Sequence, residues 1–382
     1  MRSKSDWLLQ GVHIGDEVDG ARIAPDVVIH PGCRIQGSET SIGPGSVLGA
    51  ESPVTLENSQ LGRAVKLKGG YFSGSVFFDG ANMGDGAHVR AGTILEEEAN
   101  GAHTVGLKQT IFLPFVTAGS LINFCDALMA GGTSRKDHSE IGSSYVHFNF
   151  TPHQDKATAS LIGDVPNGVF MDQNAIFLGG QGGLVGPSQI AYGSVIAAGG
   201  ICRVDLLEQN KLHIPEVPPA GTRDYEIGVY RRGDRLIQNN LIYIGNLFAL
   251  REWYRNIRTK CVRDKFDQSV LDGGLQNLDL ILKERIKRLG DVANKFEYSF
   301  RWLESHGGKP DEILVQKSFN KKWPELQKNL EALSFQPLET FVQSVEVKSS
   351  YIETIQSLEK DARESGRAWL QSIVDETAGL WT

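Results

Sequence analysis

The chain has 382 residues and a formal net charge of −7 at neutral pH. This length exceeds that of one average domain and predicts two or three structural units. Because phosphate backbones are bound by clustered Lys and Arg, the acidic balance argues against nucleic acid as the main partner. Residues 1–10 are too polar for the core of a signal peptide, and no later run has membrane-spanning length. We therefore expect a cytoplasmic location without a membrane partner.

The four cysteines, Cys33, Cys125, Cys202 and Cys261, show neither paired nor CxxC spacing. This spacing predicts neither a disulfide framework nor a thiolate zinc site. We expect buried thiols.

Aliphatic residues recur at a period of six through the first half of the chain. The positions are Ile23, Ile29 and Ile35, then after a one-residue slip Ile42 and Leu48, then Met83, Val89 and Leu95, and finally Leu184, Ile190, Ile196 and Cys202. A period of six matches neither a helix nor a simple strand, but it suits a coil of short strands whose corners hold small residues. A β-sandwich would instead show two-residue alternation with turns about every 8 to 12 residues. The sequence predicts a parallel β-helix of hexapeptide repeats over residues 11–203.

The period blurs at residues 69–80 and 105–135, where aromatic or polar residues intrude. Interruptions of this kind often become loops that build a site.

The chain changes character after Arg203. Residues 204–245 contain a proline-rich connector and the turn-like RRGD, which predicts a linker and a small hairpin formed by residues 225–230 and 235–243. Apolar residues then step by three and four through residues 275–303, which predicts one long helix, and a second stripe over residues 338–373 predicts a long final helix. Residues 246–382 should therefore form an α-helical domain.

A basic cluster lies near the start of this region. It consists of Arg251, Arg255, Arg258, Arg263 and Lys265. These cations could recognise an anionic group or could form a solvated helix face.

Several segments, read in order, resemble a known family. They are IGPG at 42–45, MGDGAHVRAGTIL at 83–95, VGLK at 105–108, AGSLINF at 118–124, LIGD at 161–164 and LVGPSQIAYGSVIAAG at 184–199. Together they resemble the C-terminal, acetyltransferase half of GlmU, a family that also has a uridylyltransferase half. The resemblance implies a left-handed β-helix that forms a homotrimer and transfers an acyl group from acetyl-CoA to an amino-sugar phosphate, with no tightly bound cofactor. The Gly-rich nucleotide-binding loop of the uridylyltransferase half has no counterpart in this sequence.

The resemblance places several residues in a substrate site. Arg90 and Lys108 match an arginine and a lysine that the family uses on the sugar phosphate, and both cations suit a dianion. The other residues assigned to the substrate are Ser120, Asn123, Asn149, Phe150 and Lys156. Ala197 and Ala198 match positions that pack against the pantetheine arm of coenzyme A.

Ser120 departs from the family, which has its general base histidine at this position. A serine hydroxyl is not basic, whereas histidine titrates near working pH. His147 is the candidate replacement base.

Three functions remain open. The first is a transferase acting on a sugar phosphate or nucleotide sugar, which best explains the cationic positions. The second is a trimeric sugar-nucleotide binding or scaffold protein, favoured by Ser120. The third takes His138, His147 and His153 as zinc ligands, although the spacing of the hexapeptide-repeat carbonic anhydrases is missing and we predict no metal.

Overall fold

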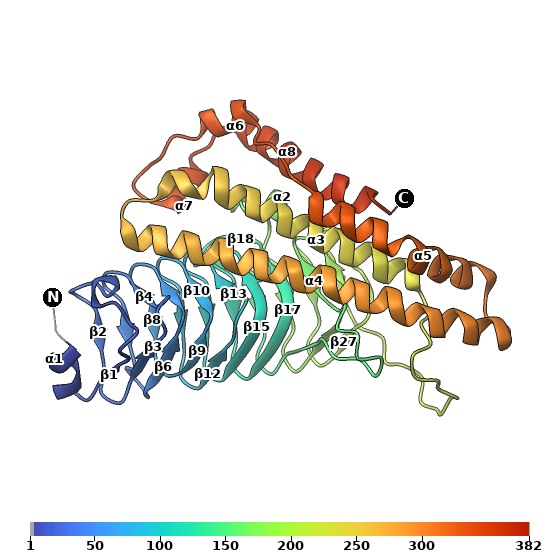
Figure 1. Ribbon diagram of the computed structural model, residues 1–382, viewed down its shortest axis with the longest axis horizontal. Coiled ribbons are helices and arrows are strands. Elements are labelled where there is room, and N and C mark those ends of the chain that lie inside the picture. Colours follow the sequence, from blue (N-terminus) through green and yellow to red (C-terminus); the bar gives the residue numbers. More distant parts are fainter. Residues whose placement is uncertain (1–3, 382) are drawn as a thin grey trace.

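The computed structural model describes residues 4–381. Its first half winds into a parallel β-solenoid of about eleven turns, and its second half forms a layer of helices along one side of the solenoid (Figure 1). A short helix, α1 (Lys4–Leu9), precedes the first coil. This arrangement confirms the predicted parallel β-helix followed by an α-helical region.

The solenoid has three faces. The first face contains β1 (His13–Ile14), β3 (Arg34–Gln36), β6 (Val54–Glu57), β9 (Gly70–Ser73), β12 (Ala87–Val89), the first halves of β15 (Val105–Phe112) and β17 (Ile122–Met129), β21 (Val146–Phe148), β24 (Gly183–Val185) and β27 (Ile201–Cys202). The second face contains β4 (Ser41–Ile42), β7 (Gln60–Leu61), β10 (Ser75–Phe77), β13 (Thr93–Leu95), the second halves of β15 and β17, β22 (Ser160–Ile162) and β25 (Gln189–Ile190). The third face contains β2 (Val28–Ile29), β5 (Val47–Leu48), β8 (Lys66–Leu67), β11 (Asn82–Met83), β14 (Asn100–Gly101), β16 (Thr117–Ala118), β20 (Glu140–Ile141), β23 (Phe177–Leu178), β26 (Val195–Ile196) and β28 (Leu212–His213).

The register explains the six-residue period. Val28 pairs with Val47 and Val47 with Lys66, so each of these coils takes 19 residues, close to three hexapeptides. We call the interior enclosed by the three faces the prism. Every residue of the predicted period is at most 5% exposed, because its side chain points into the prism and stacks on the next coil. At two predicted corners Gly45 and Gly86 have φ of +73° and +70°, a conformation that glycine adopts without strain.

The two segments where the period blurs are mostly coil strands, and only the end of the second segment leaves the coils. Residues 69–80 hold β9 and β10, and residues 105–135 hold β15 and β17, which run from the first face onto the second. The aromatic residues that disturb the pattern fill the prism: Phe72, Phe77, Phe112 and Phe124 are fully buried. An excursion begins at the end of the second segment, with the hairpin of β18 (Gly132–Ser134) and β19 (Asp137–His138), and others follow at residues 149–159 and around α2 (Val165–Gly168).

The helical layer covers the second face. Its elements are α3 (Gly233–Asn256), α4 (Lys265–Ser305), α5 (Pro310–Ala332), α6 (Glu339–Ser344), α7 (Tyr351–Gln356) and α8 (Lys360–Gly379). Helix α4 packs along β4, β7, β10 and β13, and α3 packs on α4 and reaches β22. Helix α5 packs on α4, and α8 packs on α3 (Figure 1). Across residues 4–381, none of the helices combines the length and the apolar run needed to cross a bilayer.

Some helix predictions were correct and others were wrong. The predicted long helix at 275–303 lies within α4. The predicted hairpin is wrong, because residues 235–243 belong to α3, a helix buried on several sides that lacks a simple apolar stripe. The predicted long final helix is interrupted: α6 ends at Ser344, and α7 begins after Ser350, whose side chain caps the amide of Glu353. Pro310 starts α5, since the first helical position tolerates proline.

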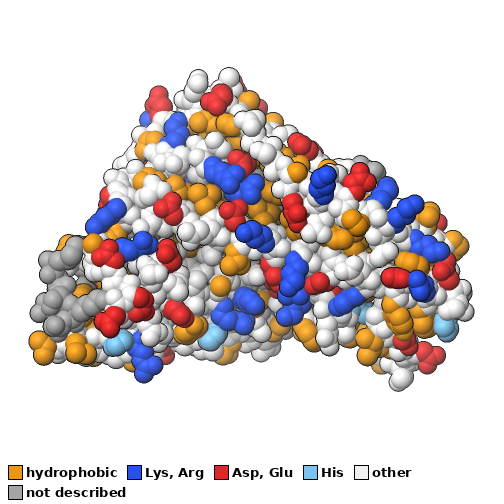
Figure 2. Space-filling view, in the orientation of Figure 1, with side chains coloured by type: hydrophobic (Ala, Val, Ile, Leu, Met, Phe, Trp, Pro, Cys, Tyr) orange, Lys and Arg blue, Asp and Glu red, His pale blue; other side chains and the backbone are white. Residues whose placement is uncertain are grey.

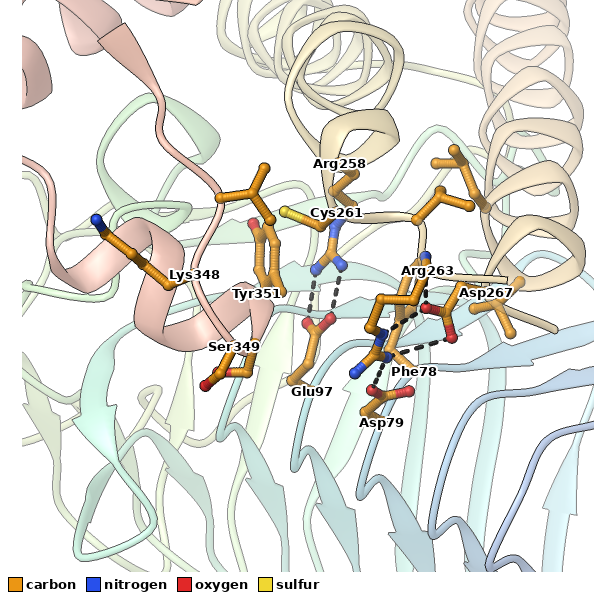
Figure 3. A pocket seen from close by; sticks show the side chains of 15 residues that line it. Phe78, Asp79, Glu97, Arg258, Cys261, Arg263, Asp267, Lys348, Ser349 and Tyr351 are labelled. Atoms are coloured by element: carbon orange, nitrogen blue, oxygen red, sulfur yellow. Dashed lines mark hydrogen bonds and ion pairs between the residues drawn. The ribbon is translucent and has the colours of Figure 1, made fainter. Parts of the chain in front are cut away.

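Arg258 anchors the helical layer to the solenoid. It is 4% exposed, and its guanidinium donates to both carboxylate oxygens of Glu97 at 2.7 Å while Nη2 lies 2.8 Å from Glu96 (Figure 3). The rings of Phe78 and Tyr351 lie 4.1 and 3.8 Å from the guanidinium carbon. Burial raises the pKa of the Glu96 carboxyl, although Arg258 acts in the opposite direction.

The rest of the basic cluster is also held within the chain. Arg251 and Arg255 pair with Glu252, Arg263 pairs with Asp79 and Asp267, and Lys265 donates to the carbonyl of Ala21. The adjoining cavity has a volume of only about 60 Å³. Arg258, Arg263 and Lys265 therefore connect the helical layer to the coils, whereas Arg251 and Arg255 form pairs within that layer. Arg255, Arg263 and Lys265 are also exposed to solvent, as expected for a solvated face.

We expect Arg258→Ala to lower the free energy of unfolding by about 3–5 kcal/mol, because it leaves Glu96 and Glu97 buried without their cation. Denaturant unfolding followed by circular dichroism measures the change. Arg301→Ala is the control, since the Arg301 side chain is 70% exposed in a surface pair with Glu297, and it should leave the unfolding free energy nearly unchanged. Equal stabilities of Arg258→Ala and wild type would contradict an anchoring role.

Candidate functional site

Arg90 and Lys108 lie side by side on the open first face. Arg90 directly follows β12 and Lys108 lies in β15, and the pairing of Val89 with Leu107 puts the two cations in register on adjacent coils. Both side chains are exposed, and neither forms an ion pair with a carboxylate of the described residues. Lys and Arg side chains are visible on the solenoid below α4 in Figure 2. We call Arg90 and Lys108 the cationic column.

Cys125 continues this column on the next coil. It pairs with Lys108 across the strands, and its Sγ lies 4.0 Å from Nη2 of Arg90. Burial raises the pKa of the Cys125 thiol, and neighbouring Asp126 adds to this effect, while Arg90 and Lys108 oppose it. The thiol therefore stays protonated and supplies a weakly polar floor beside the two cations.

A hollow lies beside the cationic column. Asn123 is exposed and pairs with Gly106 on the preceding coil. A Cβ at Gly106 would meet only the carbonyl oxygen of Ile122, at 3.6 Å, so the surface there is open. The predicted substrate residue Asn123 thus lies next to the cations, on a face that can hold one side of a ligand.

Asn149 and Lys156 meet at the corner between the first and second faces. Arg285 of α4 pairs there with Asp126 at 2.8 Å, and the amide of Asn149 donates to the same carboxylate at 2.6 Å. The carbonyl of Lys156 accepts from Arg285 at 3.3 Å. Phe150, between them in sequence, is 63% exposed. The structure therefore gathers Asn149 and Lys156 around a buried arginine and leaves Phe150 on the surface.

An open cleft lies along α4 beside this corner. Its volume is about 690 Å³, and its lining includes Gln109, which follows Lys108 in sequence, and Lys283 and Lys287 of α4. Gln109 accepts from Arg285 at 2.6 Å. Asp279 and Glu284 of α4 also line the cleft, so its two lysines are accompanied by two carboxylates.

His147 lies inside the prism. It is 2% exposed, and its Nδ1 lies 2.5 Å from the carbonyl oxygen of Cys125 while its Nε2 lies 2.8 Å from Oγ of Ser160. Burial lowers the pKa of this imidazole, although the bond to Cys125 and the charge of Asp126 act in the opposite direction. A general base must reach the proton that it removes, and both nitrogens of His147 are occupied away from solvent. This geometry gives His147 a structural role rather than the catalytic role expected from sequence.

The histidines considered as zinc ligands are not gathered into one site. His138 lies in the β18–β19 hairpin, with Nδ1 3.0 Å from the carbonyl of Arg135, and His153 accepts from the amide of Gly228. Within residues 4–381, no group of three or more His, Cys, Asp or Glu side chains could hold a metal ion.

Ser120 lies at the corner between the third and first faces. Its Oγ is 2.9 Å from Nδ1 of His103, which occupies the same corner one coil earlier. The amide of Ser120 donates to Oγ of Ser143 on the following coil, at 3.2 Å. His103 was not among the residues selected from the sequence. Its position 17 residues before Ser120, about one coil, was the available signal.

Ala197 and Ala198 lie on the same corner, farther along the solenoid. Backbone bonds link the corner residues coil by coil, from Ser144 to Ser120, from Gln181 to Ser143 and from Gly199 to Gly180. Ala198 is exposed, and a Cβ added at Gly199 would meet no atom within 4 Å. Small residues thus leave an open edge that leads from Ser120 to the two alanines.

Comparisons with curated proteins identify relatives of about half of the chain. The chain is 30% identical over 208 residues to a protein named Bifunctional protein GlmU from Pelobacter propionicus, covering 52% of this chain and 40% of the relative. It is 28% identical over 212 residues to the protein of that name from Thermotoga petrophila, a match that covers 54% of this chain and 43% of the relative. It is 27% identical over 210 residues to that from Kineococcus radiotolerans, which covers 54% of this chain and 38% of the relative. The matches fall on the C-terminal acetyltransferase half of GlmU, as the sequence motifs predicted. The chain spans about two fifths of the length of these relatives, and no family model matches it.

Burial of His147 predicts a pH dependence of stability. Because the pKa of His147 is lowered in the fold, the unfolded chain binds a proton in a pH range where the folded chain does not. The free energy of unfolding should therefore fall as the pH drops below about 6.5, by at most about 1.4 kcal/mol per pH unit from this group. We expect His147→Gln to show a smaller loss between pH 6.5 and 5, measured by urea unfolding at several pH values.

His13→Gln is the matched control, because His13 is exposed on the first coil. It should retain the wild-type slope. A slope that is also unchanged in His147→Gln would mean that His147 takes up its proton in the folded state.

Proposed function

We propose that the solenoid carries an acyltransferase site for a sugar phosphate or nucleotide sugar, related to the acetyltransferase half of GlmU. Arg90 and Lys108 carry this proposal, because they lie in register on the open first face and form no ion pair with any described carboxylate. A guanidinium and an ammonium on adjacent coils, roughly 4.8 Å apart in the strand-to-strand direction, suit the oxygens of one phosphate group. The similarity of this half of the chain to GlmU proteins supports a transferase of this type.

The acceptor would lie along the first face. With its phosphate on the cationic column, the sugar ring extends over the hollow at Gly106 toward Asn123. Lys156 and Asn149 would close the other side from the corner around Arg285. The exposed ring of Phe150 can cover an apolar part of the ligand.

Acetyl-CoA is the proposed donor, and it supplies the acyl group as a thioester. Its pantetheine arm would follow the open edge formed by the small corner residues, where Ala197 and Ala198 leave room for a flexible chain. A larger side chain at either position would fill this edge.

A homotrimer is part of the proposal. The outward residues Phe177, Val195 and Leu212 pair in register on three consecutive coils of the third face, and they are 40%, 38% and 66% exposed. A continuous apolar column of this kind favours association with another subunit. A neighbouring subunit would also complete the half-open acceptor site.

The direct test is acyl transfer. Purified protein is mixed with acetyl-CoA and a panel of amino-sugar phosphates, and release of free coenzyme A is followed with a thiol reagent. Turnover that requires one acceptor supports the transferase. Absence of turnover with every acceptor, together with measurable binding of a sugar nucleotide, would instead support the binding or scaffold role, which the loss of the family histidine at Ser120 favours.

We expect Arg90→Gln and Lys108→Gln each to weaken acceptor binding by about 1.5–3 kcal/mol, because each removes a charged contact to phosphate. This corresponds to an increase in KM of roughly 10- to 100-fold. Arg34→Gln is the control, since Arg34 is exposed on the same face near the start of the solenoid. Unchanged KM in both site variants would rule out the cationic column as the phosphate site.

The trimer has a separate test. Val195→Lys places a charge in the centre of the apolar column, so we expect the variant to lose association, with light scattering reporting the mass of one chain. Lys66→Glu, on the same face but outside the column, should retain the wild-type mass. A single-chain mass for the wild-type protein would contradict the proposed assembly.

A further inference from the structure

We propose that His103 is the general base of the acyl transfer, acting through the hydroxyl of Ser120. This inference rests on the proposed function and names the group that carries out its proton transfer. The observation behind it is the 2.9 Å contact between Nδ1 of His103 and Oγ of Ser120, two side chains from consecutive coils that meet at one corner.

The side chains of His103 and Ser120 are accessible from solvent, unlike that of His147. His103 is exposed and Ser120 is half-buried, whereas His147 is enclosed in the prism. Among the described residues, only Ser120 is hydrogen-bonded to a ring nitrogen of His103, and the His103 side chain belongs to an exposed residue. A base in this place can exchange its proton with bulk water after each turnover.

The corner also holds the pair in position. The amide of Leu121 donates to the carbonyl of His103, and the amide of Ser120 donates to Ser143 Oγ, so backbone bonds fix both residues relative to each other. The carboxylate of the preceding corner residue, Asp85, is turned toward Ser52, with which it forms a hydrogen bond. It therefore does not compete with Ser120 for the imidazole.

The pair lies between the two proposed substrate sites. His103 precedes Lys108 by five residues along the strand direction of β15, at most about 17 Å, and Asn123 follows Ser120 by three residues. On the other side, the open edge toward Ala198 begins at Ser120. An acceptor held by its phosphate and a thioester held along the edge would bring their reacting groups together near this hydroxyl.

The chemistry balances as an acyl transfer without a covalent enzyme intermediate. The amine nitrogen of the acceptor attacks the thioester carbonyl, the new N–C bond forms, and the C–S bond breaks to release the coenzyme A thiolate. The amine proton passes to Ser120 Oγ while the Ser120 hydroxyl proton passes to Nδ1 of His103. The imidazolium then gives a proton to the thiolate, which leaves as the thiol.

Steady-state kinetics over pH 5.5–8.5 test the assignment. We expect His103→Ala to lower kcat about 100-fold or more, the usual contribution of a general base, with little change in KM for the sugar phosphate. The same variant should lose the rise of rate with pH that an imidazole base produces. Ser120→Ala should lower kcat as well, because it removes the link between the imidazole and the acceptor.

The double variant H103A/S120H supplies the decisive measurement. It puts an imidazole at position 120 and removes the one at 103, so we expect it to recover much of the activity lost in H103A. His13→Ala is the control and should have wild-type kinetics, since His13 is exposed on the first coil. Both histidines are at the surface, so circular dichroism should show that all variants fold.

The outcomes separate the two proposals. Wild-type turnover with an unchanged kcat in H103A overturns the role of His103 and leaves the transferase assignment intact. A reduced kcat in H103A without recovery in H103A/S120H, together with an unaltered pH profile, also overturns it, because the residue would then be structural. Absence of wild-type turnover with every acceptor overturns both.

Discussion

Stacking of one coil on the next is the constraint on which the whole structure depends. A strand of two or three residues cannot bury its side chains or satisfy its amides by itself, so each coil relies on the two beside it. The inward residues of the six-residue period provide the apolar core, and the parallel ladder provides the backbone bonds. The outward side chains are then free to vary, and they are arranged in straight columns with a spacing of one coil.

The helical layer covers some of these columns of outward side chains and leaves others accessible to a ligand or another subunit. Helix α4 covers the second face. Its own Arg285 pairs with Asp126 of the coils, and Arg258, in the short turn between α3 and α4, pairs with Glu97. The first face is left open, and its Arg90 and Lys108 form no ion pair with a carboxylate in residues 4–381, while the third face is left with an apolar column. In the proposed trimer, the charged first face would contact the ligand and the apolar column of the third face would contact another subunit.

The sequence allowed the solenoid to be predicted because its inward residues are close together in the chain and share one period. The site was harder to predict, because its geometry depends on contacts between residues far apart. The pairing of Arg285 with Asp126 joins the second half of the chain to the first, and nothing local in either segment indicates it.

His147 was selected because histidines are common bases, but its burial depends on the fold of the loop that follows it. His103 could not be selected by matching motifs, because its contact with Ser120 joins two consecutive coils and follows only from their register. The hairpin predicted for residues 225–230 and 235–243 was wrong for a related reason. Residues 235–243 belong to a helix buried on several sides, which has no polar face to reveal its period.

The length of α4 has a further consequence for how this protein can change over evolutionary time. The 41 residues of α4 extend about 60 Å, and eleven coils at about 4.8 Å each extend about 50 Å. The helix is therefore at least as long as the solenoid on which it packs. Repeat proteins commonly gain or lose units, because each unit contacts only its neighbours. Here, duplication of a single coil between Glu97 and Asp126 would move one anchoring carboxylate by a full coil relative to its arginine. The contacts between the helical layer and the coils therefore fix the number of coils between these carboxylates. A change in the length of the solenoid would require a matching change in the helices.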